Sequence, residues 1–240
     1  MSELGVADAA RSNAAWCDAV CSAHGSPGRL HPAYWLTRGP APPYYPNLVT
    51  LDPAVEPALT AARELGEARP SASWAVKDSF GVLPLEQLGF RLLFEAEWIV
   101  RPAAPGRPGR GARRGRWRRV ETESALSSWE AAWGESLGQP RVFLPALLRR
   151  SDVAILAAVD GDGVVTAGVA AHRTDEAVGL SNFFARGDDE GALRAECIEA
   201  AGDAFPGLPF VGYEAGRRLE ESRARGFASI GALRVWAKDA

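Results

Sequence analysis

The stretch Leu208–Trp236, LPFVGYEAGRRLEESRARGFASIGALRVW, decides the fold. Its short apolar opening predicts a strand over Leu208–Tyr213, and the polar run Arg217–Ala224 predicts a helix. Gly226-Phe227 then marks a turn into an apolar strand over Ile230–Trp236. Strand, helix and strand in this order predict a crossover-connected α/β arrangement rather than a sandwich or a helical bundle.

The residues before this stretch predict the rest of a mixed sheet. Asp160-Gly161-Asp162-Gly163 is a strong hairpin signal between two apolar runs. From Trp117 onward the order is therefore strand, helix, antiparallel meander, helix, strand, helix, strand, which is typical of an α/β fold. The expected strands lie at 117–122, 153–159, 164–172 and 177–184, and the expected helices at 123–137 and 191–204.

The N-terminal half repeats the end of this plan in outline. Residue 73 is as far from Gly89-Phe90 as residue 210 is from Gly226-Phe227, and both segments predict strand, helix and strand. The helix over Ser12–His24 matches the helix that carries Trp129. The stretch leading to the middle strand is shorter in the first half, so we infer that a strand or hairpin is lost there. Two tandem copies of one α/β fold, the first shortened, are predicted. In the first copy the expected elements are strands at 48–51, 73–76 and 92–100 and helices at 12–24 and 83–88.

An arginine-rich segment separates the two halves. Residues 101–119, RPAAPGRPGRGARRGRWRR, contain eight arginines, three prolines and four glycines. This composition is typical of a linker, and we expect domains at 1–100 and 117–240 joined by a linker at 101–116. An arginine run can also bind RNA or phosphates, but only Trp117 interrupts it with an aromatic ring, so nucleic acid is not an expected partner.

The composition is that of a globular protein. The 240 residues are 47% hydrophobic and 24% charged, with a formal net charge of −3. We find no apolar run of the roughly 18–20 residues that a membrane span needs and no signal-peptide pattern, so we expect a cytoplasmic protein. Cys17, Cys21 and His24 resemble part of a metal site, but a closed zinc site needs four ligands, and buried reduced thiols are favoured. The sequence leaves the oligomeric state open, a homodimer included.

The ending YEAGRRLEESRARGFASIGALRVW resembles the closing segment of GNAT acyltransferases, in which a helix, a Gly-Phe turn and a final strand follow the strand that lines the acyl-CoA cleft. The similarity covers the C-terminal half, and the N-terminal half resembles the family only in outline. The chain is also similar to actinobacterial GNAT-like proteins in which a degenerate copy precedes a fuller one. This resemblance implies a mixed-sheet GNAT-like fold. It also implies transfer of an acetyl or other acyl group from acyl-CoA, a co-substrate, to a small-molecule amine by direct attack.

The resemblance places the acyl-CoA site at the middle strand and the loop after it. In the family the strands corresponding to 178–184 and 208–213 splay apart, and the pantetheine arm bonds to their backbone. The family's loop then brings phosphates to backbone N–H groups at a helix start. Here that loop is longer and carries Asp188, Asp189 and Glu190, which would repel a pyrophosphate or cap the helix. The implied cofactor-binding residues are Asn182, Phe183, Phe184, Arg186, Gly187, Gly191 and Ala192. The corresponding first-copy loop, 51–56, has no glycine, and we assign no cofactor there.

The family's frequent general acid is absent. It is a tyrosine four residues before the Gly-Phe turn, and here that position is Ser222, or Leu85 in the first copy. Tyr213 and Glu214, at the end of the cleft strand, are the candidate catalytic residues. Glu214 would take a proton from the incoming ammonium through water, or else it caps the following helix; both interpretations stay open.

Three further residue groups have open roles. Ser181, with Asn182, could orient an acyl carbonyl or be an ordinary strand residue. His172 is expected in water at a hairpin end and is a poor catalytic candidate. The segment AYWLTRGPAPPYYPN, residues 33–47, either forms a wall of an acceptor pocket or packs as an apolar loop.

Three functions remain open. The first is the acyltransferase. The second is a non-catalytic protein that binds CoA or another small molecule, and the third is a different reaction on the same scaffold.

Overall fold

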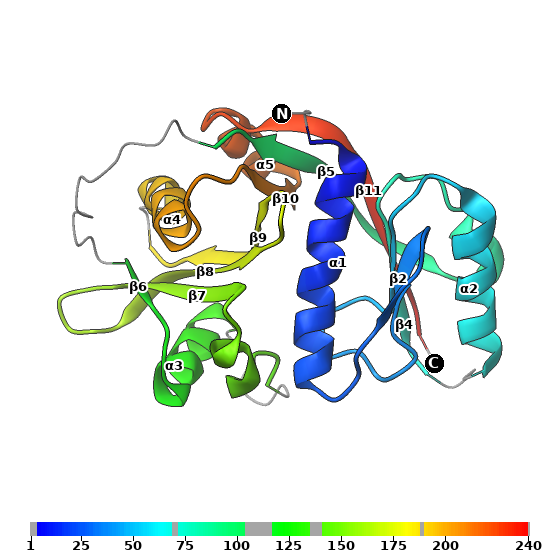
Figure 1. The fold of residues 1–240 in the computed structure, drawn as a ribbon, viewed down its shortest axis with the longest axis horizontal. Coiled ribbons are helices and arrows are strands. Elements are labelled where there is room, and N and C mark those ends of the chain that lie inside the picture. Colours follow the sequence, from blue (N-terminus) through cyan, green and yellow to red (C-terminus); the bar gives the residue numbers. More distant parts are fainter. Residues whose placement is uncertain (1–3, 69–71, 104–116, 135–140, 188–189, 240) are drawn as a thin grey trace. The chain divides into compact units, whose positions relative to one another are not determined.

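A computed structural model describes residues 4–68, 72–103, 117–134, 141–187 and 190–239. The chain divides into two compact units: Met1–Val100 with Tyr213–Ala240, and Arg101–Gly212. Each unit contains part of a mixed β-sheet with helices on both of its faces (Figure 1). Most of the predicted linker, residues 104–116, lies outside the described residues.

The sheet of the first unit has the strand order β1, β2, β3, β4, β11, β5. Strands β3 and β4 are parallel, and the other neighbours are antiparallel. Helix α1 lies on one face and α2 on the other (Figure 1). The elements of this unit are α1 (Val6–Ala23), β1 (Arg29–Leu30), β2 (Tyr34–Leu36), β3 (Leu48–Thr50), α2 (Val55–Ala68), β4 (Trp74–Asp78), the 3-10 helix η1 (Leu85–Leu88), β5 (Arg91–Arg101), α5 (Gly216–Arg223) and β11 (Ala228–Lys238).

Apolar packing holds α2 against this sheet. Trp74 and Trp236, from the neighbouring strands β4 and β11, are buried in one cluster with Leu48 of β3. The helix contributes three alanines and a leucine that recur at helical spacing, and their small size lets it approach the sheet closely. These residues are Ala58, Ala61, Ala62 and Leu65.

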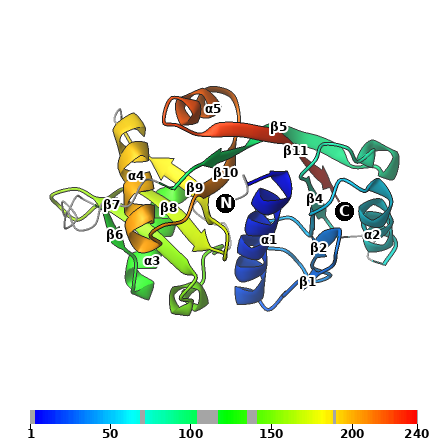
Figure 2. The same ribbon diagram turned by 45° about the horizontal axis from the view of Figure 1, so that its top comes forward.

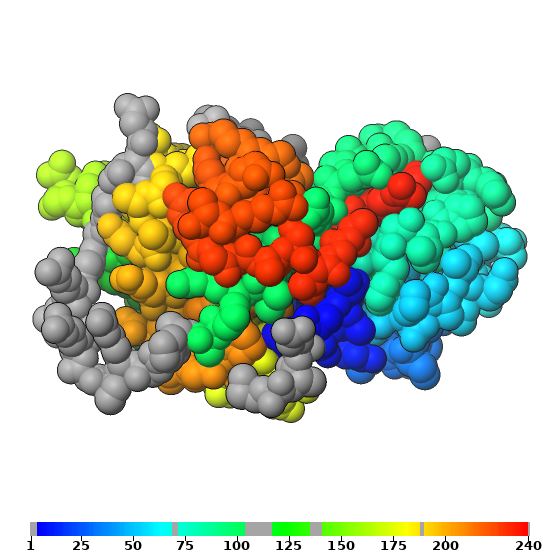
Figure 3. Space-filling model, turned by 90° about the horizontal axis from the view of Figure 1, so that it is seen from above, coloured from blue at the N-terminus to red at the C-terminus, as the bar shows by residue number. Residues whose placement is uncertain are grey.

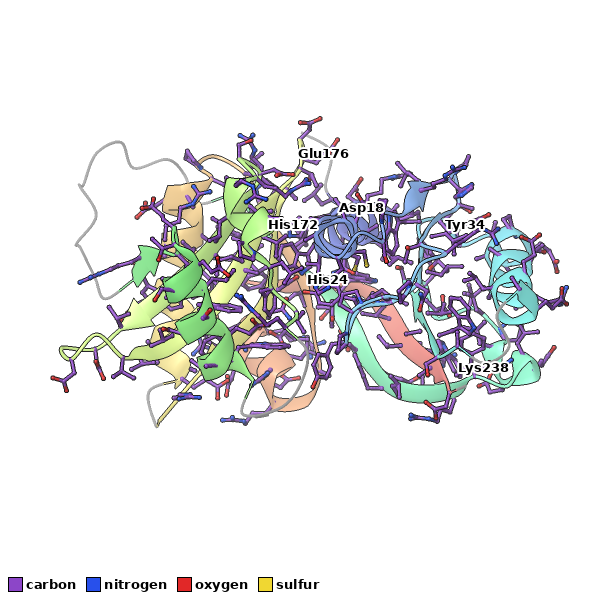
Figure 4. All side chains as sticks on the ribbon, turned by 90° about the horizontal axis from the view of Figure 1, so that it is seen from below. Asp18, His24, Tyr34, His172, Glu176 and Lys238 are labelled. Carbon is purple, nitrogen blue, oxygen red and sulfur yellow. The ribbon has the colours of Figure 1, made fainter. Side chains whose placement is uncertain are left out.

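Side-chain hydrogen bonds position α1 and the C-terminal strand. Asp18 of α1 accepts hydrogen bonds from the Gly28 amide at 2.8 Å and from Trp35 Nε1 at 3.1 Å, which joins the helix to β2. Lys238 Nζ donates to the Leu88 carbonyl oxygen at 2.8 Å, which joins the end of β11 to η1. Asp18 and Lys238 are labelled in Figure 4.

The sheet of the second unit has the order β6, β7, β8, β9, β10. Helices α3 and α4 lie on its opposite faces (Figure 2). The β7–β8 hairpin turns at the predicted position, where Asp160 Oδ1 accepts hydrogen bonds from the amides of Asp162 and Val164. The elements are β6 (Trp117–Arg119), α3 (Glu123–Trp133), the 3-10 helix η2 (Pro145–Arg149), β7 (Val153–Val159), β8 (Val165–Arg173), β9 (Val178–Ala185), α4 (Glu190–Ala204) and β10 (Phe210–Glu214), whose last two residues belong to the first unit.

The predicted strands and helices are present, and α2 (Val55–Ala68) is an additional helix that was not expected from the sequence. Three further expectations differ from the structure. The helix predicted over 83–88 is a single 3-10 turn that ends at Gly89, where φ is 79°. The strand or hairpin predicted to be lost before β3 is present as the short strands β1 and β2, so that inference is wrong. Tyr34 and Trp35, expected in a loop, lie in β2.

The prediction for His172 is also wrong. Its side chain is only 3% exposed, whereas the sequence suggested a hairpin end in water. The neighbouring strand explains the burial, because His172 is paired with Gly179 of β9. A Cβ atom at Gly179 would lie 2.0 Å from His172 Cε1, so the imidazole fills the space that a side chain would take.

The compact units do not coincide with the two halves of the sequence. Strand β11, at the C-terminal end, pairs with β4 and β5, and therefore belongs to the first unit. Residues 74–101 follow the order strand, 3-10 helix, strand, and residues 210–238 follow the order strand, α-helix, strand. In each half a parallel strand pair, β3–β4 or β9–β10, encloses one helix in sequence.

A close approach between α3 and β8 depends on Gly168. Trp129 of α3 is fully buried, and its Nε1 donates to the Leu156 carbonyl oxygen at 2.9 Å. A Cβ atom at Gly168 would lie 2.2 Å from Trp129 Nε1 and 2.5 Å from the Phe184 ring. A side chain at this position would push the buried indole away from its acceptor.

We therefore expect Gly168→Ala to lower the free energy of unfolding by about 1–3 kcal/mol, as overpacking of a core does. Chemical denaturation followed by circular dichroism measures it. Gly161→Ala is the matched control, because a Cβ atom there meets nothing within 4 Å. Equal losses in the two variants would contradict the packing argument.

Candidate functional site

The pairing of β9 with β10 ends early in the second unit. The parallel register joins Val178 with Phe210 and Gly179 with Val211, and β9 continues to Ala185. On its other side β9 stays paired with β8 as far as Ala185. Strand β10 also continues, as far as Glu214, so both strands extend beyond their last pair. Strands that stop pairing in this way leave backbone N–H and C=O groups that a ligand can bond.

A β-bulge interrupts β9 just beyond this point. Ala170 of β8 pairs with Ser181 and Gly168 pairs with Phe184, so Asn182 and Phe183 together face a single residue, Val169. Asn182 has φ of 58°, a left-handed conformation that asparagine tolerates better than most residues. A bulge of this kind re-aims side chains and bends the strand, and bulges are frequent beside active sites.

The loop after β9 brings the other predicted cofactor-binding residues to the start of α4. Phe184 is buried and its ring lies 5.3 Å from that of Trp129. Gly187 has a left-handed φ of 83°. Gly191 and Ala192 are in the first turn of α4, whose amides form the positive end of the helix dipole. Asp188 and Asp189 lie outside the described residues.

Arg186 is bound to another helix. Its Nε donates to the Ala132 carbonyl oxygen and its Nη2 to the Ala131 carbonyl oxygen, both at 3.2 Å. These carbonyls belong to the last turn of α3, where a cation is stabilised by the helix dipole. Arg186 therefore caps α3, and the Nη1 amino group is the part of its guanidinium left for the predicted phosphate contact.

A second arginine, which the sequence did not single out, lies inside the same region. Arg194 of α4 is buried, and its guanidinium carbon lies 4.3 Å from the centre of the Phe183 ring. Its Nη2 is 4.0 Å from Glu190 Oε1, one helical turn earlier. The described acid at the start of α4 thus has a cation of the same helix beside it. The sequence signal for this pair was the four-residue spacing between Glu190 and Arg194, which places the two side chains on the same face of a helix.

Tyr213 lies in a buried polar cluster of the first unit. Lys77 of β4 is 5% exposed, and its Nζ donates to Asn13 Oδ1 at 2.7 Å and to Tyr213 Oη at 3.4 Å. The same Nζ lies 4.5 Å from the centre of the Tyr213 ring, a cation–π distance. Trp98 packs edge-on against Tyr213 at 5.5 Å. The phenol is therefore held in one orientation.

Glu214 lines a groove in the first unit. The groove has a volume of about 300 Å³ and is lined by β5, β11 and the start of α5. Three carboxylates border it, those of Glu95, Glu97 and Glu214, together with Arg234. The N-cap residue of α5 is Ala215, with no side-chain cap, so Glu214 is not the N-cap of this helix. Ser222, at the position where the resemblance implies a tyrosine, is buried within α5.

The described residues outside these sites add little chemistry. No group of three or more His, Cys, Asp or Glu side chains among them is placed to hold a metal ion. Cys17, Cys21 and Cys197 are buried and free, as predicted for the first two. Burial raises the pKa of the Cys197 thiol to about 12, so it is protonated at neutral pH. No helix in the described part of the chain is long and apolar enough to cross a membrane.

Solved structures share this arrangement of strands and helices. A GCN5-related N-acetyltransferase from Kribbella flavida superimposes with a TM-score of 0.62 at 15% identity, covering 99% of this chain and 97% of that one. A protein from Novosphingobium aromaticivorans, described as an acetyltransferase of the GNAT family, matches with a TM-score of 0.54 at 15% identity, over 92% and 96% of the two chains. The chain has the GNAT fold.

A larger enzyme matches the same fold over part of its length. Saccharomyces cerevisiae N-myristoyltransferase, solved with myristoyl-CoA bound, has a TM-score of 0.54 at 10% identity, over 80% of this chain and 59% of the enzyme. No family model and no curated protein sequence matches the chain. The GNAT fold is therefore shared without close sequence similarity to these structures.

The role of Arg186 as a helix cap makes a stability prediction. We expect Arg186→Ala to lower the free energy of unfolding by about 1 kcal/mol, because two carbonyl groups at the end of α3 lose charged hydrogen-bond donors. Thermal and chemical denaturation measure this change. Arg118→Ala, at an exposed position of β6, is the matched control and should have no effect. Unchanged stability of Arg186→Ala would show that the hydrogen bonds to α3 contribute nothing.

Proposed function

We propose that this protein is an N-acyltransferase that moves an acetyl or other acyl group from acyl-CoA to a small-molecule amine. The observation that carries the proposal is the early end of β9–β10 pairing at Gly179 and Val211, followed by the bulge at Asn182, on a GNAT fold. Backbone groups freed in this way suit an extended ligand with amide groups, such as a pantetheine arm. We propose CoA contacts for the backbone of Asn182, Phe183 and Phe184.

The loop and the start of α4 would receive the phosphates. Gly187, Gly191 and Ala192 have small or no side chains, so phosphate oxygens could approach backbone N–H groups at the positive end of the helix. Arg186 would add a contact through Nη1. The described acid Glu190 weakens this site for anions, and Arg194 offsets part of its charge.

The proposed reaction is direct attack. The amine nitrogen forms a bond to the thioester carbonyl carbon, the C–S bond breaks, and the thiolate leaves and takes up a proton. Glu214 is the proposed base, which removes a proton from the incoming ammonium through water. Tyr213, whose hydroxyl accepts a hydrogen bond from Lys77, is proposed to position the acceptor. The acidic border of the groove beside Glu214 favours a cationic acceptor.

We also propose that the sequence contains two tandem copies of the fold, with domains at 1–100 and 117–240 and a linker at 101–116, of actinobacterial type. The matching order of elements in residues 74–101 and 210–238 supports this division. In the first copy, Lys77 and Asp78 at the end of β4 are buried. The first-copy loop, residues 51–56, has no glycine that would let phosphates approach its backbone, so we propose the second copy as the CoA site. We propose the cytoplasm as its compartment, since its described cysteines are free thiols.

A second function is favoured by one observation. Ser222 stands where the family has its acidic tyrosine, and it is buried, so it cannot supply a proton to a leaving thiolate. A protein that binds CoA or another small molecule without turning it over fits this loss, as does a different reaction on the same scaffold. Binding and turnover must therefore be measured separately.

Binding of acetyl-CoA by isothermal titration calorimetry tests the proposed cofactor. We expect Ala192→Glu, an exposed change in the first turn of α4, to weaken binding at least about fivefold at low salt, because an additional carboxylate would face the phosphates. The fold should be retained, since acids are favourable at a helix start. Ala195→Glu, also exposed but one turn further along α4, is the matched control. Absence of binding by the unaltered protein, or equal weakening by both variants, would contradict the site.

Turnover tests the proposed base. We expect Glu214→Gln to lower the rate of thiol release from acetyl-CoA with an amine acceptor by about a hundredfold or more, as removal of a general base does, and to abolish the acidic limb of the pH–rate profile. Glu220→Gln changes an exposed carboxylate of α5 that is bound to Arg223 and does not line the groove, and it should retain activity. A variant at 214 that unfolds at lower temperature but keeps its turnover per folded molecule would remove Glu214 from the mechanism.

A further inference from the structure

Lys77 of β4 is a buried cation whose partners are all neutral. Its ammonium donates to Asn13 Oδ1 at 2.7 Å and to Tyr213 Oη at 3.4 Å, and it lies 4.5 Å from the centre of the Tyr213 ring. In the part of the chain that the structure describes, no carboxylate forms an ion pair with it. A buried charge without a counter-ion costs stability, and departures of this kind from ordinary folding rules are concentrated at functional sites.

The elements on either side hold this ammonium and the phenol in place. Asn13 belongs to α1, which packs against β11 so closely that a Cβ atom at Gly231 would lie 2.5 Å from Val6 Cγ2. Figure 3 shows the start of α1, in dark blue, against the red C-terminal strand. Trp98 of β5 packs edge-on against the Tyr213 ring at 5.5 Å. The two polar groups therefore have fixed positions.

The hydroxyl proton of Tyr213 has no acceptor among the described residues. An ammonium group has only donors, so Lys77 occupies one lone pair of Oη and cannot accept the phenol proton. Tyr213 is only half-buried, so a ligand can reach its side chain. A phenol with a cation behind it and no protein acceptor in front is a hydrogen-bond and proton donor for a bound molecule.

Tyr213 lies on the strand that borders the proposed acyl-CoA site. Val211 is the last residue of β10 that pairs with β9, and Tyr213 follows two residues later, on the same face of the strand. It therefore belongs to the unpaired end of β10, beside which the proposed function puts the pantetheine arm. That function leaves one step without a residue, because the leaving thiolate needs a proton and the buried Ser222 cannot supply it.

A tyrosine needs a nearby cation to protonate a thiolate efficiently. Phenols ordinarily ionise at about pH 10 and thiols at about pH 8.5, so the proton transfer is uphill. A positive charge beside the phenol oxygen stabilises the phenolate that remains and reduces this difference. Lys77 is the residue that supplies such a charge to Tyr213.

The other titratable groups near Tyr213 are neutral. Cys17 of α1 donates to Asn13 Oδ1 at 3.7 Å, and burial raises the pKa of its thiol. Burial also raises the pKa of the Tyr45 phenol, which interacts with Tyr213. The neighbour on β5 is an uncharged indole. Lys77 is therefore the charged group that faces Tyr213.

Resting on the proposed acyl transfer, we propose that Lys77 is a positioning residue whose ammonium makes Tyr213 the acid that protonates the departing thiolate. The amine nitrogen bonds to the thioester carbonyl carbon, the C–S bond breaks, and its electron pair stays on sulfur. Sulfur takes the Tyr213 proton, and the phenolate remains beside the ammonium. A proton that the acceptor nitrogen loses then restores the phenol, so an ammonium acceptor yields the amide, the thiol of CoA and one released proton. The second lone pair of Oη stays available to an acceptor N–H.

Thiol release from acetyl-CoA with an amine acceptor tests the pair. We expect Tyr213→Phe to lower kcat by about a hundredfold and Lys77→Met by at least about tenfold, because the first loses the proton and the second the charge that stabilises the phenolate. The Kd for acetyl-CoA from calorimetry should change less than about threefold, since both groups act after substrate binding. The double variant should be no slower than Tyr213→Phe, because Lys77 acts through Tyr213. Lys77→Arg, which keeps the charge, should recover part of the loss.

Lys238→Met is the matched control. Lys77 and Lys238 are the only lysines of the chain, and Lys238 also lies over an aromatic ring, that of Phe90, at 5.8 Å. Its removal should leave kcat unchanged. Thermal denaturation verifies each fold, and Tyr213→Phe, which keeps the ring, tests the acid even if Lys77→Met does not fold.

The outcomes separate this role from the proposed function. A protein that releases no thiol overturns both. A protein that releases thiol, but whose Tyr213→Phe or Lys77→Met variant keeps its kcat, overturns the role of Lys77 alone. A double variant that is slower than either single variant also overturns it, because the two residues then act independently.

A ring-difluorinated tyrosine in place of Tyr213 distinguishes proton transfer from positioning. Fluorine makes the phenol more acidic and changes its shape little. If Tyr213 gives up its proton, activity is lost as the pH rises through ionisation of the phenol, so the basic limb of the pH–rate profile should move to lower pH. A basic limb that stays where it lies in the unaltered protein would show that the hydroxyl only positions a ligand, and it would overturn the proposal.

Discussion

Strand β11 joins the sheet of the first unit. It pairs with β4 along one edge and with β5 along the other, so the N-terminal strands and β5 belong to one sheet through the last strand of the chain. Trp236 on this strand is buried in the core that also holds α2. Pairing between residues so distant in sequence has a high loop-closure cost and is repaid only when the whole sheet forms. The first unit therefore depends on the C-terminal residues both for its hydrogen bonds and for its core.

Polar groups buried near β4 add specificity to this apolar framework. Asp78 is buried, and burial raises the pKa of its carboxyl group, although its oxygens accept hydrogen bonds from the amides of Phe80, Gly81 and Leu83. These bonds define the turn after β4. Lys77, one residue earlier, contacts α1 through Asn13. Polar groups buried in this way are costly unless paired, so each one restricts the arrangements that the surrounding elements can adopt.

The second unit has the backbone features of the GNAT fold, while several side chains differ from the pattern that the resemblance implies. The bulge at Asn182 and the start of α4 belong to the backbone. Arg186, by contrast, caps α3, and Glu190 lies beside Arg194. In the first unit, Ser222 of α5 stands where the resemblance implies a tyrosine. A fold can host several chemistries, because its backbone is maintained by packing and its reaction by a few side chains. The proposed acyltransferase and the alternative, a binding protein without catalysis, share the backbone and differ only in these few side chains.

The sequence by itself determined the α/β class and the order of strands and helices from Trp117 onward, because apolar periodicity and the turn residues Asp160–Gly163 and Gly226-Phe227 act over short distances. It also placed Tyr213 and Glu214 at the end of a strand. The tertiary structure alone decided that β11 pairs within the first unit, that Gly179 makes room for His172, and that Lys77 reaches Asn13 and Tyr213. These contacts join residues far apart in the chain or on neighbouring strands. Local pattern carries no information on which distant side chain fills a given space, and only packing settles it.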